Sequence, residues 1–64
     1  RKIEKFLILY NYPATKFGRV VAGDPRLVLD MRRGRELRAG MIARVEAFMD
    51  QYAQEIDARL EAAA

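Results

Sequence analysis

The chain has 64 residues, enough for one small domain that buries only about 60% of the surface of its unfolded chain. It has no cysteine and no histidine, which excludes disulfides and the usual thiolate and imidazole metal ligands, so we expect no metal and no cofactor. No apolar run approaches the roughly 18 residues of a membrane span, so we expect a single domain over residues 1–64 with a hydrophobic core and no membrane contact.

The net charge of +3 is spread unevenly along the chain. Residues 16–44 carry eight basic side chains against three acidic ones, whereas residues 45–64 carry five acidic side chains and one basic side chain. A basic middle followed by an acidic end indicates a polyanion-binding surface with a separate tail, although charge alone fits an ordinary solvated surface equally well.

Residues 2–10 are predicted to form the first helix. Ile8 and Leu9 interrupt its apolar spacing and leave a strand open as an alternative, and Pro13 ends the segment because it disfavours helix at the preceding residue. The apolar residues that recur at helical spacing are Ile3, Phe6, Leu7 and Tyr10. The three tyrosines of the chain, which are Tyr10, Tyr12 and Tyr52, are expected either at the rim of the core or at an interface.

A second helix is predicted over residues 14–22, where apolar residues again recur at helical spacing. It is expected to end at Gly23, because a residue without a Cβ readily takes the left-handed conformation of a helix C-terminal cap. The residues expected to face inward are Phe17, Val20 and Val21.

A third helix is predicted over residues 25–33. Asp24 is a favoured N-cap, since its carboxylate can accept the free amides of the first turn, and Pro25 suits the first helical position, where no amide hydrogen is needed. Gly34 is expected to stop this helix. The two helices would therefore be joined by a very tight turn.

The last predicted element is a long amphipathic helix over residues 39–61. Its apolar positions, spaced by three or four, are Ile42, Val45, Phe48, Met49, Tyr52, Ile56 and Leu60. The part up to about Tyr52 is long enough to close a small core, so the later apolar residues have nothing of their own chain to cover them. We predict a homodimer through Tyr52, Ile56 and Leu60; a solvent-exposed extension, or one that docks onto another part of the protein, is the alternative.

Residue sizes around the turn fit a helix-turn-helix. Two steeply crossing helices need a small residue where their backbones touch, which Gly18 supplies, and Ala22 is small enough for the turn. The sequence resembles the repressor and Cro-type helix-turn-helix family, and more closely a group of short bacterial and prophage transcriptional regulators. The matching residues are Thr15, Phe17, Gly18, Arg19, Asp24, Pro25, Asp30, Met31, Gly34, Arg35, Arg44, Val45 and Phe48.

This resemblance implies an all-α domain of four or five helices, with the helix-turn-helix at residues 15–34 and residues 25–33 as the recognition helix in the major groove. Arg26 is the first candidate for a base contact, because a guanidinium can bind O6 and N7 of guanine, and Leu29 is expected at a thymine methyl group. Asp30 is expected either to be a salt-bridge partner or to act as a negative discriminator that disfavours binding to the wrong bases. Phosphate contacts are expected from Thr15, Lys16, Arg19, Arg32, Arg33 and Arg35.

The resemblance and the charge distribution together predict a sequence-specific double-stranded DNA-binding regulator, bacterial or phage-related, in the cytoplasm at the nucleoid. We expect no enzyme, since the chain has no serine, cysteine or histidine nucleophile or base, and no small-molecule site, since its four glycines are isolated. Two alternatives stay open. One is an architectural DNA-binding protein, and the other is a helical protein-interaction module that binds an acidic partner through its basic face.

Overall fold

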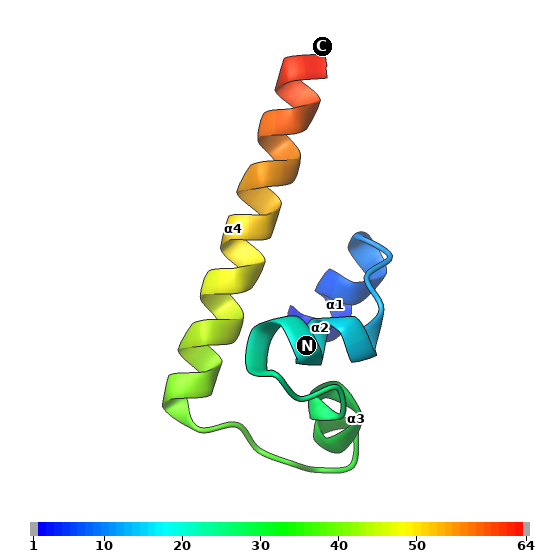
Figure 1. Cartoon of the computed structure of the whole chain (residues 1–64), viewed down its shortest axis with the longest axis vertical. Coiled ribbons are helices and arrows are strands. Elements are labelled where there is room, and N and C mark those ends of the chain that lie inside the picture. Colours follow the sequence, from blue (N-terminus) through cyan, green and yellow to red (C-terminus); the bar gives the residue numbers. More distant parts are fainter. Residues whose placement is uncertain (1, 64) are drawn as a thin grey trace.

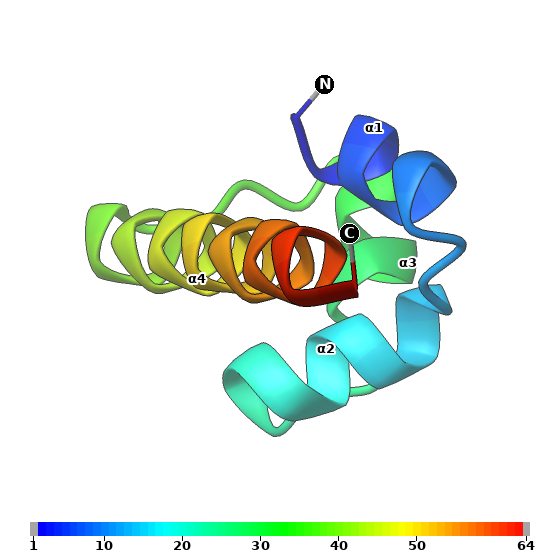
Figure 2. The same cartoon turned by 90° about the horizontal axis from the view of Figure 1, so that it is seen from above.

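A computed structural model describes residues 2–63 of the chain, which are all-helical, with four helices and no strand. The helices are α1 (Lys2–Leu9), α2 (Ala14–Ala22), α3 (Leu27–Arg32) and α4 (Ala39–Ala63). The three short helices gather beside the first half of α4, and its second half extends beyond them (Figure 1). Seen from above, α1 and α2 lie apart with α3 beneath them (Figure 2). The molecule is therefore about twice as long as it is wide, at 41 × 21 × 20 Å.

The first helix is confirmed as α1, which ends at Leu9, one residue before its predicted end. Its buried residues are the expected Ile3, Phe6 and Leu7. The two residues that broke the predicted spacing, Ile8 and Leu9, are 82% and 74% exposed. They therefore lie on the outer face of α1, and the alternative of a strand is wrong.

The second helix has the predicted bounds, but one of its inward residues was predicted wrongly. Phe17 is fully buried and Val21 is 6% exposed, whereas Val20 is 51% exposed. Successive residues of an α-helix are turned by about 100°. The buried face of α2 is centred between Phe17, Gly18 and Val21, so Val20 points to the side of it.

An aromatic cluster of six rings connects α1, α2 and α4, and Phe6 lies at its centre. The ring of Phe6 is 4.9 Å from that of Tyr10, 5.3 Å from that of Tyr52 and 5.6 Å from that of Phe17, centroid to centroid. The members of the aromatic cluster are Phe6, Tyr10, Tyr12, Phe17, Phe48 and Tyr52. All three tyrosines thus belong to the rim of the core.

The turn between α2 and α3 brings the two backbones into direct contact. Gly23 takes the left-handed conformation with φ at 66°, and its amide donates to the carbonyl oxygen of Arg19 over 2.9 Å. The Asp24 amide donates to the carbonyl oxygen of Gly18 over 3.1 Å. A Cβ on Gly18 would collide with the carbonyl oxygen of Asp24 and lie 3.0 Å from the Cβ of Leu27. The prediction that a small residue is needed at Gly18 is therefore confirmed.

The third helix is shorter than predicted. Regular helix begins at Leu27, two residues after the predicted start, because Pro25 and Arg26 form a turn. In that turn the Asp24 carboxylate accepts the Arg26 amide over 3.0 Å, and the Asp24 carbonyl accepts the Leu27 amide over 3.1 Å. The prediction that Asp24 is the N-cap and Pro25 the first helical residue is therefore wrong, because Arg26 is the N-cap and the Asp24 hydrogen bonds stabilise the turn before it.

The long helix α4 is confirmed, and it continues two residues past its predicted end to Ala63. One contact that fastens it to α2 was not predicted. The Arg44 Nη2 donates to the carbonyl oxygen of Val21 over 2.9 Å, so it satisfies one of the free carbonyls at the C-terminal end of α2. None of the helices within residues 2–63 combines the length and the apolar character that crossing a membrane requires.

Candidate nucleic-acid interface

The predicted recognition helix α3 lies at the end of the molecule farthest from the C-terminal end of α4 (Figure 1). Arg26, the residue directly before α3, has a side chain that is 66% exposed, and Leu29 of α3 is 40% exposed. Leu27 and Val28 face the core, where they are fully buried or nearly so. The helix therefore presents the side that was expected to face outward.

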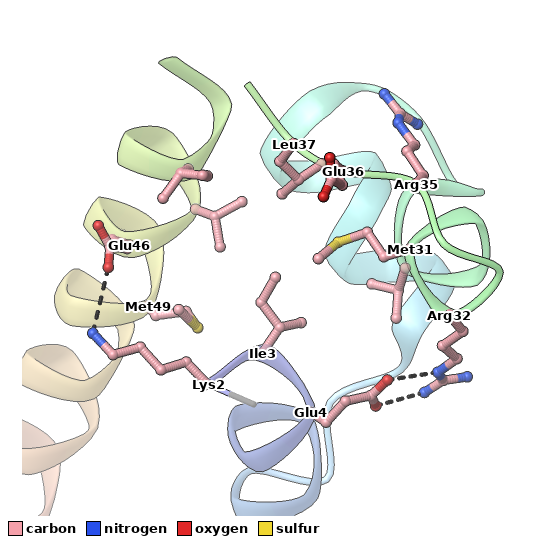
Figure 3. Close-up of a pocket in the computed structure, with 13 residues that line it drawn as sticks. Lys2, Ile3, Glu4, Met31, Arg32, Arg35, Glu36, Leu37, Glu46 and Met49 are labelled. Atoms are coloured by element: carbon pink, nitrogen blue, oxygen red, sulfur yellow. Dashed lines mark hydrogen bonds and ion pairs between the residues drawn. The ribbon is translucent and has the colours of Figure 1, made fainter. Parts of the chain in front are cut away.

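Arg32 was predicted to contact phosphate, but its guanidinium is paired inside the molecule. Its Nε and Nη2 donate to the two carboxylate oxygens of Glu4 over 2.7 and 2.8 Å (Figure 3). This pair joins α3 to α1, and the hydrogen bonds to Glu4 raise the pKa of Arg32 above its usual value. A phosphate contact from Arg32 requires this bidentate pair to open.

A second ion-pair network holds the chain on either side of α3. The Arg35 Nη1 lies 3.0 Å from Asp24 Oδ2 and 3.6 Å from Asp30 Oδ2. The other oxygen of Asp30 lies 4.0 Å from the Nε of Arg26. The hydrogen bond from Arg35, and then the one from the Arg26 amide, lower the pKa of the Asp24 carboxyl. Asp30 is thus placed as a salt-bridge partner, as one of its two predicted roles required.

Other cations of this end make no ion pair within residues 2–63. Arg33 lies directly after α3, and Arg38 lies in the link before α4. Lys16, on α2, has its Nζ 5.2 Å from the centroid of the Tyr12 ring, which orients the side chain without neutralising it. We use the name basic end for the five exposed cations of α2, of the surroundings of α3 and of the link before α4, which are Lys16, Arg19, Arg26, Arg33 and Arg38.

Sequence reasoning missed Arg38 as a candidate contact residue, although it is one of the eight basic residues in the region of basic excess. Thr15 is exposed in the first turn of α2, in agreement with its expected place on the outer surface. Most of the predicted DNA-contacting side chains are therefore exposed, while the ion pairs of Arg32 and Arg35 hold α3 in place.

A groove of about 610 Å³ lies between the start of α1, α3, the link before α4 and α4 itself (Figure 3). Its floor is apolar, with Ile3, Met31 and Met49 among its lining residues. Two ion pairs lie at its rim. Arg32 pairs with Glu4, and the Nζ of Lys2 lies 3.4 Å from Oε2 of Glu46. Within the described range of residues, no group of three or more carboxylates lies close enough to hold a metal ion.

The residues predicted for a homodimer interface have different surroundings. Tyr52 contacts the rings of Phe6 and Tyr10 within its own chain, at 5.3 and 5.0 Å between centroids. Ile56 is half-buried, and Leu60 is 65% exposed on the part of α4 that extends beyond the other helices. The homodimer therefore stays a prediction, with Ile56 and Leu60 as the residues still available for it.

Comparison of the chain with protein-family models, with curated proteins and with solved structures found no match. The function of this molecule is therefore inferred from its own surface.

Proposed function

We propose that the chain binds double-stranded DNA sequence-specifically, as a transcriptional regulator whose α2 and α3 act as a helix-turn-helix. The observation that carries this proposal is the position of the basic end. Its five cations lie on α2, around α3 and in the link before α4. Among residues 2–63 they have no close carboxylate partner apart from the 4.0 Å approach of Asp30 to Arg26. Because phosphate neutralisation supplies most of the affinity of proteins for duplex DNA, such a surface suits a nucleic acid.

The rigidity of the α2–α3 unit supports sequence-specific contacts with DNA bases in addition to contacts with phosphates. The close approach at Gly18, the backbone hydrogen bonds of the turn and the Arg35 network leave α3 little freedom relative to α2. A recognition helix must be held in this way, because base contacts depend on a fixed position of each side chain. Arg26 at the N-terminal end of α3 then becomes the base-reading side chain, with Leu29 beside it.

The acidic part of the molecule also favours an orientation in which α3 faces the DNA. Residues 45–63 carry five acidic side chains and one basic side chain, and they form the part of α4 that points away from α3 (Figure 1). A molecule with separated charges of opposite sign is steered by the field of a polyanion, so its basic end approaches the phosphates first. The field of DNA therefore presents α3 to the duplex.

The experiment that tests this proposal compares three arginine variants on a duplex selected for binding. We expect Arg26→Ala to cost about 1–3 kcal/mol and to remove the preference at one base pair, whereas Arg33→Ala weakens binding to all sequences alike. Arg59→Ala, on the acidic half of α4, is the matched control and leaves affinity unchanged or slightly lower. The readout is fluorescence anisotropy with the duplex and its single-base variants. Full affinity in both Arg26→Ala and Arg33→Ala would contradict the proposal.

A further inference from the structure

We propose that the apolar stripe on the second half of α4, together with the groove that α4 forms with α1, is a docking surface for a basic amphipathic helix of another protein. The stripe lies on the half of α4 that points away from α3 (Figure 1), so the proposal goes beyond DNA binding and does not depend on it. DNA and this partner would be able to bind at the same time.

The apolar part of the surface is a stripe on the half of α4 that the other helices do not cover. Its residues follow one another at intervals of three, four and three, which keeps them on one face of a helix. They are Ala53, Ile56, Leu60 and Ala63. Leu60 is 65% exposed and Ile56 is half-buried, so a partner helix would gain apolar contact along this stripe.

The stripe runs into a groove of about 450 Å³ between α1 and α4. Leu9 of α1, which is 74% exposed, lines one wall of this groove, and Ala53 lines the other. The first residue of the stripe is thus also a residue of the groove. A helix laid along the stripe would therefore reach Leu9, at a wall of the groove that also carries Lys2 and Lys5.

Acidic side chains follow one edge of this apolar surface. They are Glu46, Asp50, Asp57 and Glu61, at intervals of four, seven and four. At about 100° of turn per residue, all four lie within about 60° of one another on the helix. Glu46 is paired with Lys2, whereas Asp50, Asp57 and Glu61 make no ion pair within the described residues. The edge therefore needs a partner with lysine or arginine at matching intervals.

The same edge argues against a second copy of this chain as the occupant. In an antiparallel pair of identical helices, the two-fold axis places the same flank of each helix together. The acidic edges of the two copies would then face each other. Such like charges across an interface are unfavourable, so we infer a partner of opposite charge.

The test uses two peptides that share the apolar stripe and differ in charge. One is the sequence of residues 45–63 with E46K, D50K, D57K and E61K, and the other is the unchanged sequence of the same residues. Anisotropy of the labelled peptides is measured against the full chain. We expect the lysine peptide to bind. The affinity of the unchanged acidic peptide is expected to be lower by at least about tenfold, a difference of about 1.4 kcal/mol or more.

Variants of the full chain locate the binding. Leu60→Ser is expected to abolish binding of the lysine peptide, whereas Ile8→Ser, at a residue that is 82% exposed but outside the groove, leaves it unchanged. Reversing charge with D57K and E61K in the chain is expected to reverse the order of the two peptides. Each variant is first checked for an unchanged helical circular dichroism spectrum and for unchanged duplex binding, which depends on the other end of the molecule.

Three results would overturn the inference. They are no binding of the lysine peptide, binding that persists in Leu60→Ser, and equal binding of both peptides, which would make a second copy of the chain the better occupant. None of these results bears on DNA binding, because the duplex is absent from the peptide titrations.

Discussion

Replacing Gly18 by alanine is expected to destabilise the fold by about 3 kcal/mol or more, since an added methyl group in a closely packed contact forces the surrounding atoms apart. The new Cβ meets the carbonyl oxygen of Asp24, which belongs to the backbone of the α2–α3 turn and cannot rotate away. Relief requires the hydrogen bond from the Asp24 amide to the Gly18 carbonyl to open. At about 0.05–0.15 kcal/mol per residue, a chain of this length has only about 3–10 kcal/mol of stability to lose.

The measurement is thermal unfolding followed by circular dichroism, where a loss of this size lowers Tm by at least about 12 °C in a domain of this length. Gly40→Ala is the matched control, because Gly40 also lies in a helix but has nothing within 4 Å of its added Cβ. That variant is expected to gain up to about 1 kcal/mol from the higher helix propensity of alanine. Equal melting temperatures of Gly18→Ala and wild type would contradict the close contact of α2 and α3.

Replacing Phe6 by alanine is expected to cost about 3–5 kcal/mol, the usual range for removing a buried phenylalanine side chain. Phe6 is 6% exposed, and its ring contacts those of the five other members of the aromatic cluster. Removing it leaves a cavity between α1, α2 and α4 that these rings cannot fill without leaving their tilted and edge-on arrangements. We therefore expect α1 to separate from α4 under mild denaturing conditions.

Urea unfolding measures this cost, and near-ultraviolet circular dichroism reports the order of Tyr10, Tyr12 and Tyr52, which all contact Phe6. The control is Ile8→Ala, two residues away on the same helix, where the side chain is 82% exposed and the expected change stays within about 0.5 kcal/mol. A cost below about 1 kcal/mol for Phe6→Ala would mean that the aromatic cluster is not the centre of the core.

Local signals in the sequence were sufficient for most of the helices. The bounds of α2 and the start of α4 follow from apolar periodicity and from Gly23, because these signals act within a few residues. The start of α3 was placed two residues early, since the Asp24–Pro25 pair serves a turn as readily as a first helical position. Val20 was assigned to the core because periodicity tolerates an apolar residue beside the buried face.

The candidate site was less predictable, because charge pairing depends on tertiary placement. The pair of Arg32 with Glu4 joins residues 28 positions apart. No local pattern distinguishes Arg32 from Arg33, which makes no ion pair in the part of the chain that the structure describes. The distance of Tyr52 from α1 likewise depends on where α1 lies along α4, so its place in the aromatic cluster could not be read from the apolar stripe. The sequence showed which side chains were basic. The fold determined which of them pair with carboxylates of the chain and which stay available for contacts with DNA.

The most direct test of DNA binding by the basic end is titration of the full chain into a labelled, randomised duplex pool at several salt concentrations, with sequencing of the bound fraction. For about four phosphate contacts, log K is expected to fall with log salt at a slope of about −4, and the bound fraction is expected to be enriched in one motif. Binding with this slope but no enriched motif would indicate an architectural protein. Absence of binding at low salt would contradict the proposed function and assign the basic end to an acidic protein partner.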